Sequence, residues 1–315
     1  MQALIDAANT LTDEAITAML KGQKDALGMP LYVHRDRRSL VGLVRNDIVA
    51  LVMAADGPLV VEDGAVFFAD SYLTATPLER TLALEQLLIH WRDDPANTLL
   101  HASKWRSERY SVWDCDGKIA FMIERSAAGL LAVRSYGCHV NGFVKGDSRS
   151  PSKMWVARRS YTKQTYPGML DNIVGGGLPH GMTPGENVIK ECFEEAGIQV
   201  NAANSLHVLK PVSVLTAFMI SERGWVPDTE YIYDLEVDSS FTPVCQDGEV
   251  HGFELMDLAT VKTLLLKGEF MPESGLVVLD FMIRHGFLDA STEPDYVSIV
   301  TRLHRTHPFP GPCYA

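Results

Sequence analysis

Three glutamates stand close together in the second half of the chain: Glu191, Glu194 and Glu195. In an α-helix, side chains three and four positions apart are neighbours, so these carboxylates would share one face. Like charges at that spacing destabilise a helix by roughly 0.2–0.5 kcal/mol per pair. A Mg²⁺ or Mn²⁺ ion bound between them would make this clustering favourable, because hard divalent cations bind carboxylate and phosphate oxygens. The pattern indicates either a metal site for phosphate chemistry or a solvated acidic face.

The residues around the glutamates predict a helix with defined ends, from Pro184 to Ala196. Thr183 and Glu186 have the spacing of a capping box, and proline suits the first helical position because its missing N–H costs nothing there. Gly197 fits the left-handed residue that ends a helix. At about 100° per residue, one face of the helix is apolar and is expected to be buried, opposite the glutamates. The predicted buried face consists of Val188, Ile189, Cys192, Phe193 and Ala196.

A glycine run, Gly175 to Gly177, precedes this helix. Glycine lets the backbone approach a ligand closely, which suits phosphate binding, and a turn with positive φ explains the run equally well. Strands are expected on both sides, and a last helix near the end. The expected strands cover 140–144, 154–157, 208–218 and 231–237, and the expected last helix covers 276–284. A helix set among strands indicates an α/β or α+β domain.

The first 130 residues are expected to form a smaller α+β domain. Helices are predicted over 11–23 and 77–92 from their apolar periodicity. Between them, 40–68 contains short β-rich pieces broken by Asp-Gly turns. Apolar runs on both sides of Asp116-Gly117 predict a hairpin over 110–124.

Composition narrows the class of protein. Of 315 residues, 46 % are apolar and 22 % charged, as in folded soluble proteins. The net charge is −12. An acidic protein gains no binding free energy from the release of counterions from nucleic acid, so no nucleic-acid partner is expected. The longest apolar run, 48–55, is too short to cross a bilayer, and the N-terminus lacks the features of a signal sequence. Five scattered cysteines fit reduced thiols, so we expect a cytoplasmic protein without a membrane partner.

Residues 176–198 resemble the Nudix box, G-x5-E-x7-R-E-U-x-E-E-x-G-U, in which U is aliphatic. With Gly176 as the first glycine, the three glutamates fall on acidic positions of the second half of the box. Met182 replaces the first Glu of the box, which leaves the number of bound metal ions open. Lys190 replaces the Arg that orients a catalytic Glu by a forked contact, and Lys offers a point charge instead.

Further segments resemble one branch of this superfamily, the Nudix hydrolases related to thiamine pyrophosphokinase. They are 105–110, 136–142, 155–160, 166–171, 231–235, 247–250 and 279–286. The resemblance implies a Nudix α/β/α sandwich with a mixed sheet over 131–288, within an α/β (α+β) fold class. It also implies a preceding N-terminal α+β domain over 1–130 and a C-terminal extension over 289–315 that packs on the Nudix domain.

The function implied by the resemblance is that of a Mg²⁺- or Mn²⁺-dependent pyrophosphohydrolase, acting on acid anhydrides of phosphorus. Members of this branch convert thiamine diphosphate and its damaged oxo- and oxy-analogues to the monophosphate, a form of metabolite repair. Glu191, Glu194 and Glu195 would hold the metal, with Glu194 as first candidate for the general base and Glu249 as second. Implied substrate contacts are Arg158, Arg159, Lys163, Tyr166, Gly176 and Gly177. Implied orienting or structural residues are Lys190, Thr183 and Gly197.

Two alternatives stay open. One keeps the hydrolase and changes the substrate to a nucleotide sugar, a dinucleotide or coenzyme A. The other is a Nudix module that senses a diphosphate without hydrolysing it; Met182 and Lys190 favour this module, and the three glutamates count against it. The sequence leaves the choice between monomer and homodimer open. Aromatic side chains that could stack on a substrate ring are Trp155, Tyr161, Tyr166 and Phe270, although aromatics in strands are more often core.

Overall fold

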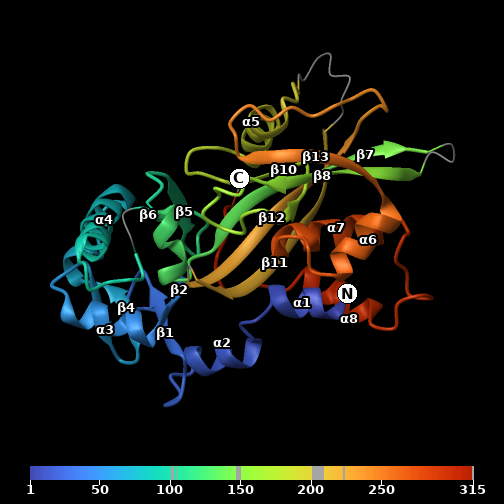
Figure 1. The fold of residues 1–315 in the computed structure, drawn as a ribbon. Helices are drawn as coiled ribbons and strands as arrows, with labels where there is room; N and C mark the ends of the chain where they lie inside the picture. Colours follow the sequence, from blue (N-terminus) through green and yellow to red (C-terminus); the bar gives the residue numbers. More distant parts are fainter. Residues whose placement is uncertain (101–102, 104, 147–149, 201–208, 223, 314–315) are drawn as a thin grey trace.

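The computed structural model describes residues 1–100, 103, 105–146, 150–200, 209–222 and 224–313. Figure 1 shows two neighbouring parts, an N-terminal part with its own small sheet and a larger part around a long twisted sheet. The first helix, α1 (Gln2–Ala8), lies with the larger part, beside α8 (Tyr296–Leu303).

The N-terminal part combines a four-stranded sheet, several helices and a hairpin. The strand order in the sheet is β2-β1-β4-β3, with β1 and β4 parallel and the other neighbours antiparallel. The elements up to the hairpin are α2 (Asp13–Leu20), β1 (Gly28–Tyr32), β2 (Leu40–Arg45), α3 (Asn46–Ala54), β3 (Leu59–Glu62), β4 (Ala65–Phe68), η1 (Asp70–Tyr72) and α4 (Pro77–Asp93). The hairpin consists of β5 (Arg109–Trp113) and β6 (Ile119–Glu124), and the 3₁₀ segment η3 (Arg125–Leu130) follows it.

The helices and the hairpin predicted for this part are confirmed, and so are short β pieces within 40–68, at β2, β3 and β4, but one apolar run between them is not a strand. Residues 46–54 form α3. Only one face of this apolar run is buried, and Met53 on the other side is 70 % exposed. The buried residues of α3 are Ile48, Val49 and Val52. Burial on a single face every three to four residues is typical of a helix, whereas the sequence showed only that the run is apolar.

A seven-stranded mixed sheet forms the centre of the larger part. Its main strand order is β11-β12-β7-β8-β13, and β10 pairs with β7 while β9 pairs with β8. Strands β7 and β12 are parallel, and the other pairs are antiparallel. The strands are β7 (Ser135–Lys145), β8 (Pro151–Arg159), β9 (Leu170–Asp171), β10 (Val174–Gly177), β11 (Leu209–Ser221), β12 (Gly224–Glu236) and β13 (Val250–Asp257). The four predicted strands are confirmed, with residue 208 outside the described residues, and the structure adds β9, β10 and β13.

Helices cover both faces of this sheet (Figure 1). On one face lies α5 (Pro184–Ala196), whose Val188 and Cys192 pack with Cys138 and Val140 of β7. On the other face lie α6 (Leu258–Leu266) and α7 (Pro272–Arg284), together with α1 and α8. This arrangement confirms the predicted fold class, an α/β/α sandwich preceded by an α+β domain.

The helix predicted over 276–284 lies within α7, but it is not the last helix, because α8 follows it. The predicted domain boundaries after residues 130 and 288 stay predictions. Among the described residues, no helix combines the length and the apolar character that crossing a bilayer requires.

Candidate active site

Helix α5 has the ends that the sequence predicts. The Thr183 hydroxyl accepts a hydrogen bond from Glu186 N at 3.3 Å, and the Glu186 carboxylate accepts one from Thr183 N at 2.9 Å. Pro184 stands at the start of the helix, and Gly197 ends it in the left-handed region with φ of 66°. Thr183 and Gly197 therefore shape the helix that carries the three glutamates.

The predicted buried face of α5 is partly wrong, because the helix is rotated about its axis. Ile189 and Phe193 are 45 % and 50 % exposed, whereas Asn187 and Glu195 are buried. Two hydrogen bonds to β10 account for the rotation. The Asn187 amide donates to the Gly177 carbonyl at 3.1 Å, and the Glu195 carboxylate accepts from a backbone N–H of β10 at 2.8 Å. These contacts bring the polar side of the helix onto the sheet.

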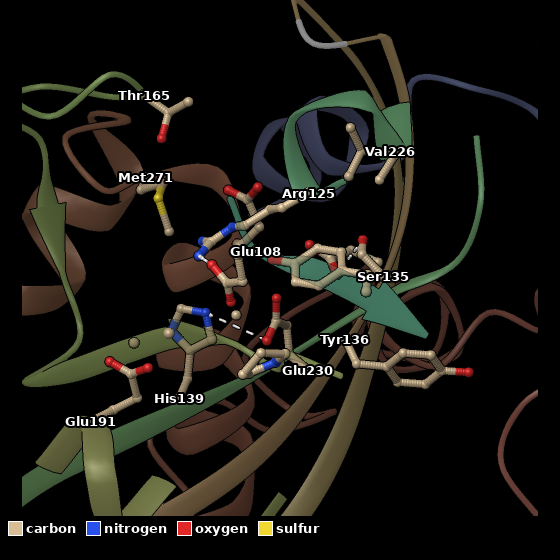
Figure 2. A pocket seen from close by; sticks show the side chains of 18 of the residues that line it. Glu108, Arg125, Ser135, Tyr136, His139, Thr165, Glu191, Val226, Glu230 and Met271 are labelled. Atoms are coloured by element: carbon tan, nitrogen blue, oxygen red, sulfur yellow. Dashed lines mark hydrogen bonds and ion pairs between the residues drawn. The ribbon is translucent and has the colours of Figure 1, made fainter. Parts of the chain in front are cut away.

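A cavity of about 480 Å³ lies beside α5 and β10, between the larger part and the β5–β6 hairpin. Figure 2 shows several of its side chains facing the same space from both parts. Nine of the described residues that line it carry a carboxylate, and four carry a Lys or Arg cation. The carboxylates are Glu108, Glu191, Glu194, Glu195, Asp228, Glu230, Asp247, Glu249 and Glu273. The cations are Arg125, Arg159, Lys163 and Lys190.

Lys190 joins two of the three box glutamates. Its ammonium lies 2.7 Å from Glu191 Oε1 and 2.9 Å from Glu194 Oε2. Burial lowers the pKa of Lys190, but the hydrogen bonds to the two carboxylates outweigh it, so the net pKa is raised. Glu191 is the more buried of the two, and Glu194 lies nearer to solvent. Lys190 can therefore orient both glutamates with one charge.

Glu195 is the most buried of the three glutamates. Its side chain accepts the hydrogen bond from Gly175 N, and burial raises its pKa to about 8, with the charge of Asp171 adding to the effect. Burial likewise raises the pKa of Glu230 well above its usual range. With a pKa of about 8, Glu195 holds a proton near neutral pH, and a bound cation would displace that proton.

The glycine run is a strand and not a turn. Gly175, Gly176 and Gly177 form the end of β10 opposite β7, and none of them has a positive φ. A Cβ at Gly176 would overlap the side chain of Glu191, and a Cβ at Gly177 would overlap the hydroxyl of Tyr110. Glycine is needed here because the side chains of Glu191 and Tyr110 approach the backbone closely.

Two of the predicted phosphate-binding cations line the cavity, and one does not. Arg159 is buried, pairs with Asp171 at 2.7 Å and also donates to the backbone carbonyls of Thr165 and Tyr166. Lys163 pairs with Glu249, and burial lowers the pKa of this lysine. The third predicted cation, Arg158, donates a hydrogen bond to a loop carbonyl at 2.9 Å and is absent from the described lining of the cavity.

The four aromatic residues considered for stacking have different positions. Tyr166 lines the cavity. Trp155 and Phe270 are buried in the cores on opposite faces of the sheet. Tyr161 is 63 % exposed and packs against the His251 ring, with 5.0 Å between the centroids. Of these four residues, Tyr166 is therefore the one that could stack on a ligand in this cavity.

Sequence reasoning missed the residues that reach the cavity from distant elements. Glu108, Tyr110 and Arg125 come from the N-terminal part, and Arg125 donates to Glu108 at 2.8 Å. On β12, Glu230 has its Oε2 3.7 Å from His139 Nε2, and burial lowers the pKa of that histidine. The segment 105–110 was noted for its resemblance, but no sequence signal placed it against the Nudix box.

The donor set fits a divalent cation chemically. No three His, Cys, Asp or Glu side chains of the described residues stand close enough to form a complete metal site. The excess of carboxylates over cations, however, leaves the cavity unsuited to an anionic diphosphate unless further positive charge enters with it. Carboxylate oxygens are the ligands that Mg²⁺ and Mn²⁺ prefer.

Comparison with known proteins divides the chain into two matched segments. Residues 136–274 match the family described as "NUDIX domain", and residues 9–135 match "Domain of unknown function (DUF4743)". The uncharacterized protein YJR142W of Saccharomyces cerevisiae is 41 % identical over 218 residues, covering 65 % of this chain and 63 % of the relative. Nudix hydrolase 20, chloroplastic, of Arabidopsis thaliana is 39 % identical over 200 residues, covering 63 % of this chain and 52 % of the relative.

The chain thus spans between about half and two thirds of the length of these relatives. The crystal structure of DR0079 from Deinococcus radiodurans shares 21 % identity and a TM-score of 0.39, covering 63 % of this chain and all of that chain. The matched segments agree with the two parts of the fold. In sequence, residues 136–274 are thus similar to the Nudix domain family, and residues 9–135 are similar to the DUF4743 family.

Proposed function

We propose that the chain is a Mg²⁺- or Mn²⁺-dependent pyrophosphohydrolase, which cleaves the diphosphate of a small molecule. The observation that carries the proposal is the cavity that gathers the three glutamates of α5, the glycine strand β10 and four cationic side chains. The Nudix match and the hydrolase names of the plant relatives support it. A cavity of this composition suits a substrate whose phosphates arrive together with a divalent cation.

Glu191, Glu194 and Glu195 would hold the metal ion. When bound, such an ion neutralises phosphate charge and lowers the pKa of a coordinated water to near neutral. Glu194 is the first candidate to accept the proton of the attacking water, because it lies at the solvent side of the cavity. Glu249 is the second candidate, and its pairing with Lys163 makes it less available as a base.

The remaining side chains would bind and orient the diphosphate. Arg159, Lys163 and Tyr166 line the cavity on the loop side, and the backbone of Gly176 and Gly177 lines it opposite them. Lys190 would keep two glutamates in place, in the role that the Nudix box gives to Arg. Arg158 would act indirectly, by holding the loop carbonyl to which it donates.

Thiamine diphosphate or its oxidised analogues are the substrates that we propose first, with the monophosphate and phosphate as products and metabolite repair as the role. The resemblance to the thiamine-related branch supports this choice. A second cavity of about 590 Å³ shares Arg125, Thr165 and Tyr166 with the first and offers room for an organic group. Nucleotide sugars, dinucleotides and coenzyme A are the alternatives. A cytoplasmic location and a monomer or homodimer are part of the same proposal.

One assay tests both activity and substrate. The protein is incubated with Mg²⁺ and with thiamine diphosphate analogues, nucleotide sugars and dinucleotides in ¹⁸O-water, and the products are analysed by mass spectrometry. We expect thiamine monophosphate analogues plus inorganic phosphate, and the labelled product identifies the attacked phosphorus. Turnover of only the nucleotide compounds would overturn the substrate, and binding without any product would favour a diphosphate sensor.

A further inference from the structure

The N-terminal domain forms part of the wall of the cavity in the Nudix domain. Glu108 and Tyr110 reach it from the region of β5, and Arg125 reaches it from the start of η3. Figure 2 shows Arg125 and Glu108 joined and facing the same space as His139, Glu191 and Glu230. The residues proposed for metal binding and this arginine therefore share one cavity, although they belong to different domains.

The four cationic side chains of the cavity differ in how many of their donors already bind protein groups. Lys190 is shared by two carboxylates, and Lys163 pairs with a carboxylate. Arg159 uses three of its nitrogens on one carboxylate and two carbonyls. Arg125 donates one side-chain hydrogen bond among the described residues, from Nη1 to Glu108. A guanidinium has five N–H donors, so Arg125 keeps the most donors for a ligand.

The guanidinium also packs on β10, the strand that borders the proposed metal ligands. Its Cζ stands 5.6 Å from the ring centroid of Tyr110. A Cβ built on Gly177 would lie 3.1 Å from Cζ and Nη2 of Arg125, so this side chain packs directly on β10. The adjacent residue of β10, Gly176, faces Glu191, so Arg125 and Glu191 approach this strand from opposite faces, because successive residues of a strand point to opposite sides. Both side chains nevertheless line the same cavity where it borders β10, so an anion held there by a metal ion on the glutamates can also face Arg125.

We propose that Arg125 binds a phosphate oxygen of the substrate's diphosphate, so that the N-terminal domain completes the active site. This inference rests on the proposed function for its substrate class. The planar guanidinium suits two neighbouring oxygens of a phosphate, which a lysine at this position could contact only as a point charge. Glu108 would hold the guanidinium in place through its hydrogen bond with Nη1.

The test compares Arg125→Ala with Arg109→Ala. Arg109 is a matched control, because it begins the hairpin that Arg125 directly follows, pairs with Glu85 at 2.7 Å and is 35 % exposed, against 32 % for Arg125. It is absent from the described lining of the cavity. The ligand is methylenediphosphonate with Mg²⁺, which the protein cannot hydrolyse, and binding is measured by calorimetry. Loss of a hydrogen bond to a charged group predicts roughly ten- to hundredfold weaker binding for Arg125→Ala.

The control should bind within about twofold of the wild-type protein. Arg125→Lys should fall between the wild-type protein and Arg125→Ala, and it serves as the test if the alanine variant fails to fold. Equal binding by the wild-type protein and both Arg125 variants would overturn the inference. If the wild-type protein binds the diphosphonate but hydrolyses no diphosphate ester, the proposed function fails, while weaker binding by Arg125→Ala still supports the contact. Failure of the wild-type protein to bind would overturn both.

Discussion

Gly176→Ala should separate activity from stability in this protein. Gly176 has a negative φ in strand β10, so the backbone accepts alanine without strain. The added methyl group would overlap Cγ, Cδ and Oε1 of Glu191, which are the outer atoms of a flexible side chain. Glu191 can move aside at little cost to folding, but it then leaves its 2.7 Å contact with Lys190. Misplacement of a catalytic group by about 1 Å costs on the order of 100-fold in rate.

We therefore expect kcat/KM for the diphosphate substrate to fall about 10- to 100-fold in Gly176→Ala, with a higher Mg²⁺ concentration for half-maximal activity. The free energy of unfolding in urea should change by no more than about 1 kcal/mol, because only a flexible side chain is displaced. Gly185→Ala is the control, because a Cβ there meets open space and the residue lies in the first turn of α5. Full activity and an unchanged Mg²⁺ dependence in Gly176→Ala would refute the placement of Glu191 at the reacting centre.

Three further predictions concern the base, the loop and the pH dependence of stability. Glu194→Gln should lower kcat about 10²–10⁴-fold at saturating Mg²⁺, whereas the exposed Glu254→Gln outside the cavity should not, and a loss below tenfold would remove Glu194 as the base. Arg159→Met should destabilise the fold by about 3–5 kcal/mol in urea, because it leaves the buried Asp171 charge unpaired, and a change below 1 kcal/mol would contradict that pairing. Burial lowers the pKa of His307 to about 4 in the folded protein, below the ordinary value of 6.5, so the unfolded chain binds more protons between these values. The free energy of unfolding should therefore rise from pH 4 to 6.5 by at most about 3 kcal/mol from this group, and urea titrations of His307→Gln should show a smaller rise.

The sequence predicts the ends of α5 because their chemistry is local. The capping pair, the first-turn proline and the final glycine lie within the helix or next to it, and no distant contact is needed to recognise them. The rotation of the helix is different. It depends on hydrogen bonds from Asn187 and Glu195 to β10, and periodicity alone assigns both residues to the exposed side. Helical spacing correctly predicts which side chains are neighbours on the helix. Which side of the helix is buried depends on polar contacts with the rest of the fold.

The N-terminal contribution to the site could not be predicted for a related reason. Glu108 and Arg125 are more than 50 residues before the Nudix box, and they reach the cavity only because the β5–β6 hairpin packs beside β10. Neither residue has a spacing that indicates phosphate binding. The glycine run is the opposite case. The sequence indicates that these glycines are important, but it does not show why glycine is needed there. Only the structure shows which side chain each glycine makes room for.

The replacement of the box Arg by Lys190 bears directly on the choice between hydrolase and sensor. A forked arginine can hold one carboxylate by two hydrogen bonds, but an ammonium with three donors can divide its contacts between two carboxylates. Lys190 does so, at 2.7 Å from Glu191 and 2.9 Å from Glu194. One residue thereby contacts two glutamates, so Lys190 could perform the orienting task of the arginine in another form. The substitution by itself therefore gives no support to the sensor, and the distinction depends on whether product forms.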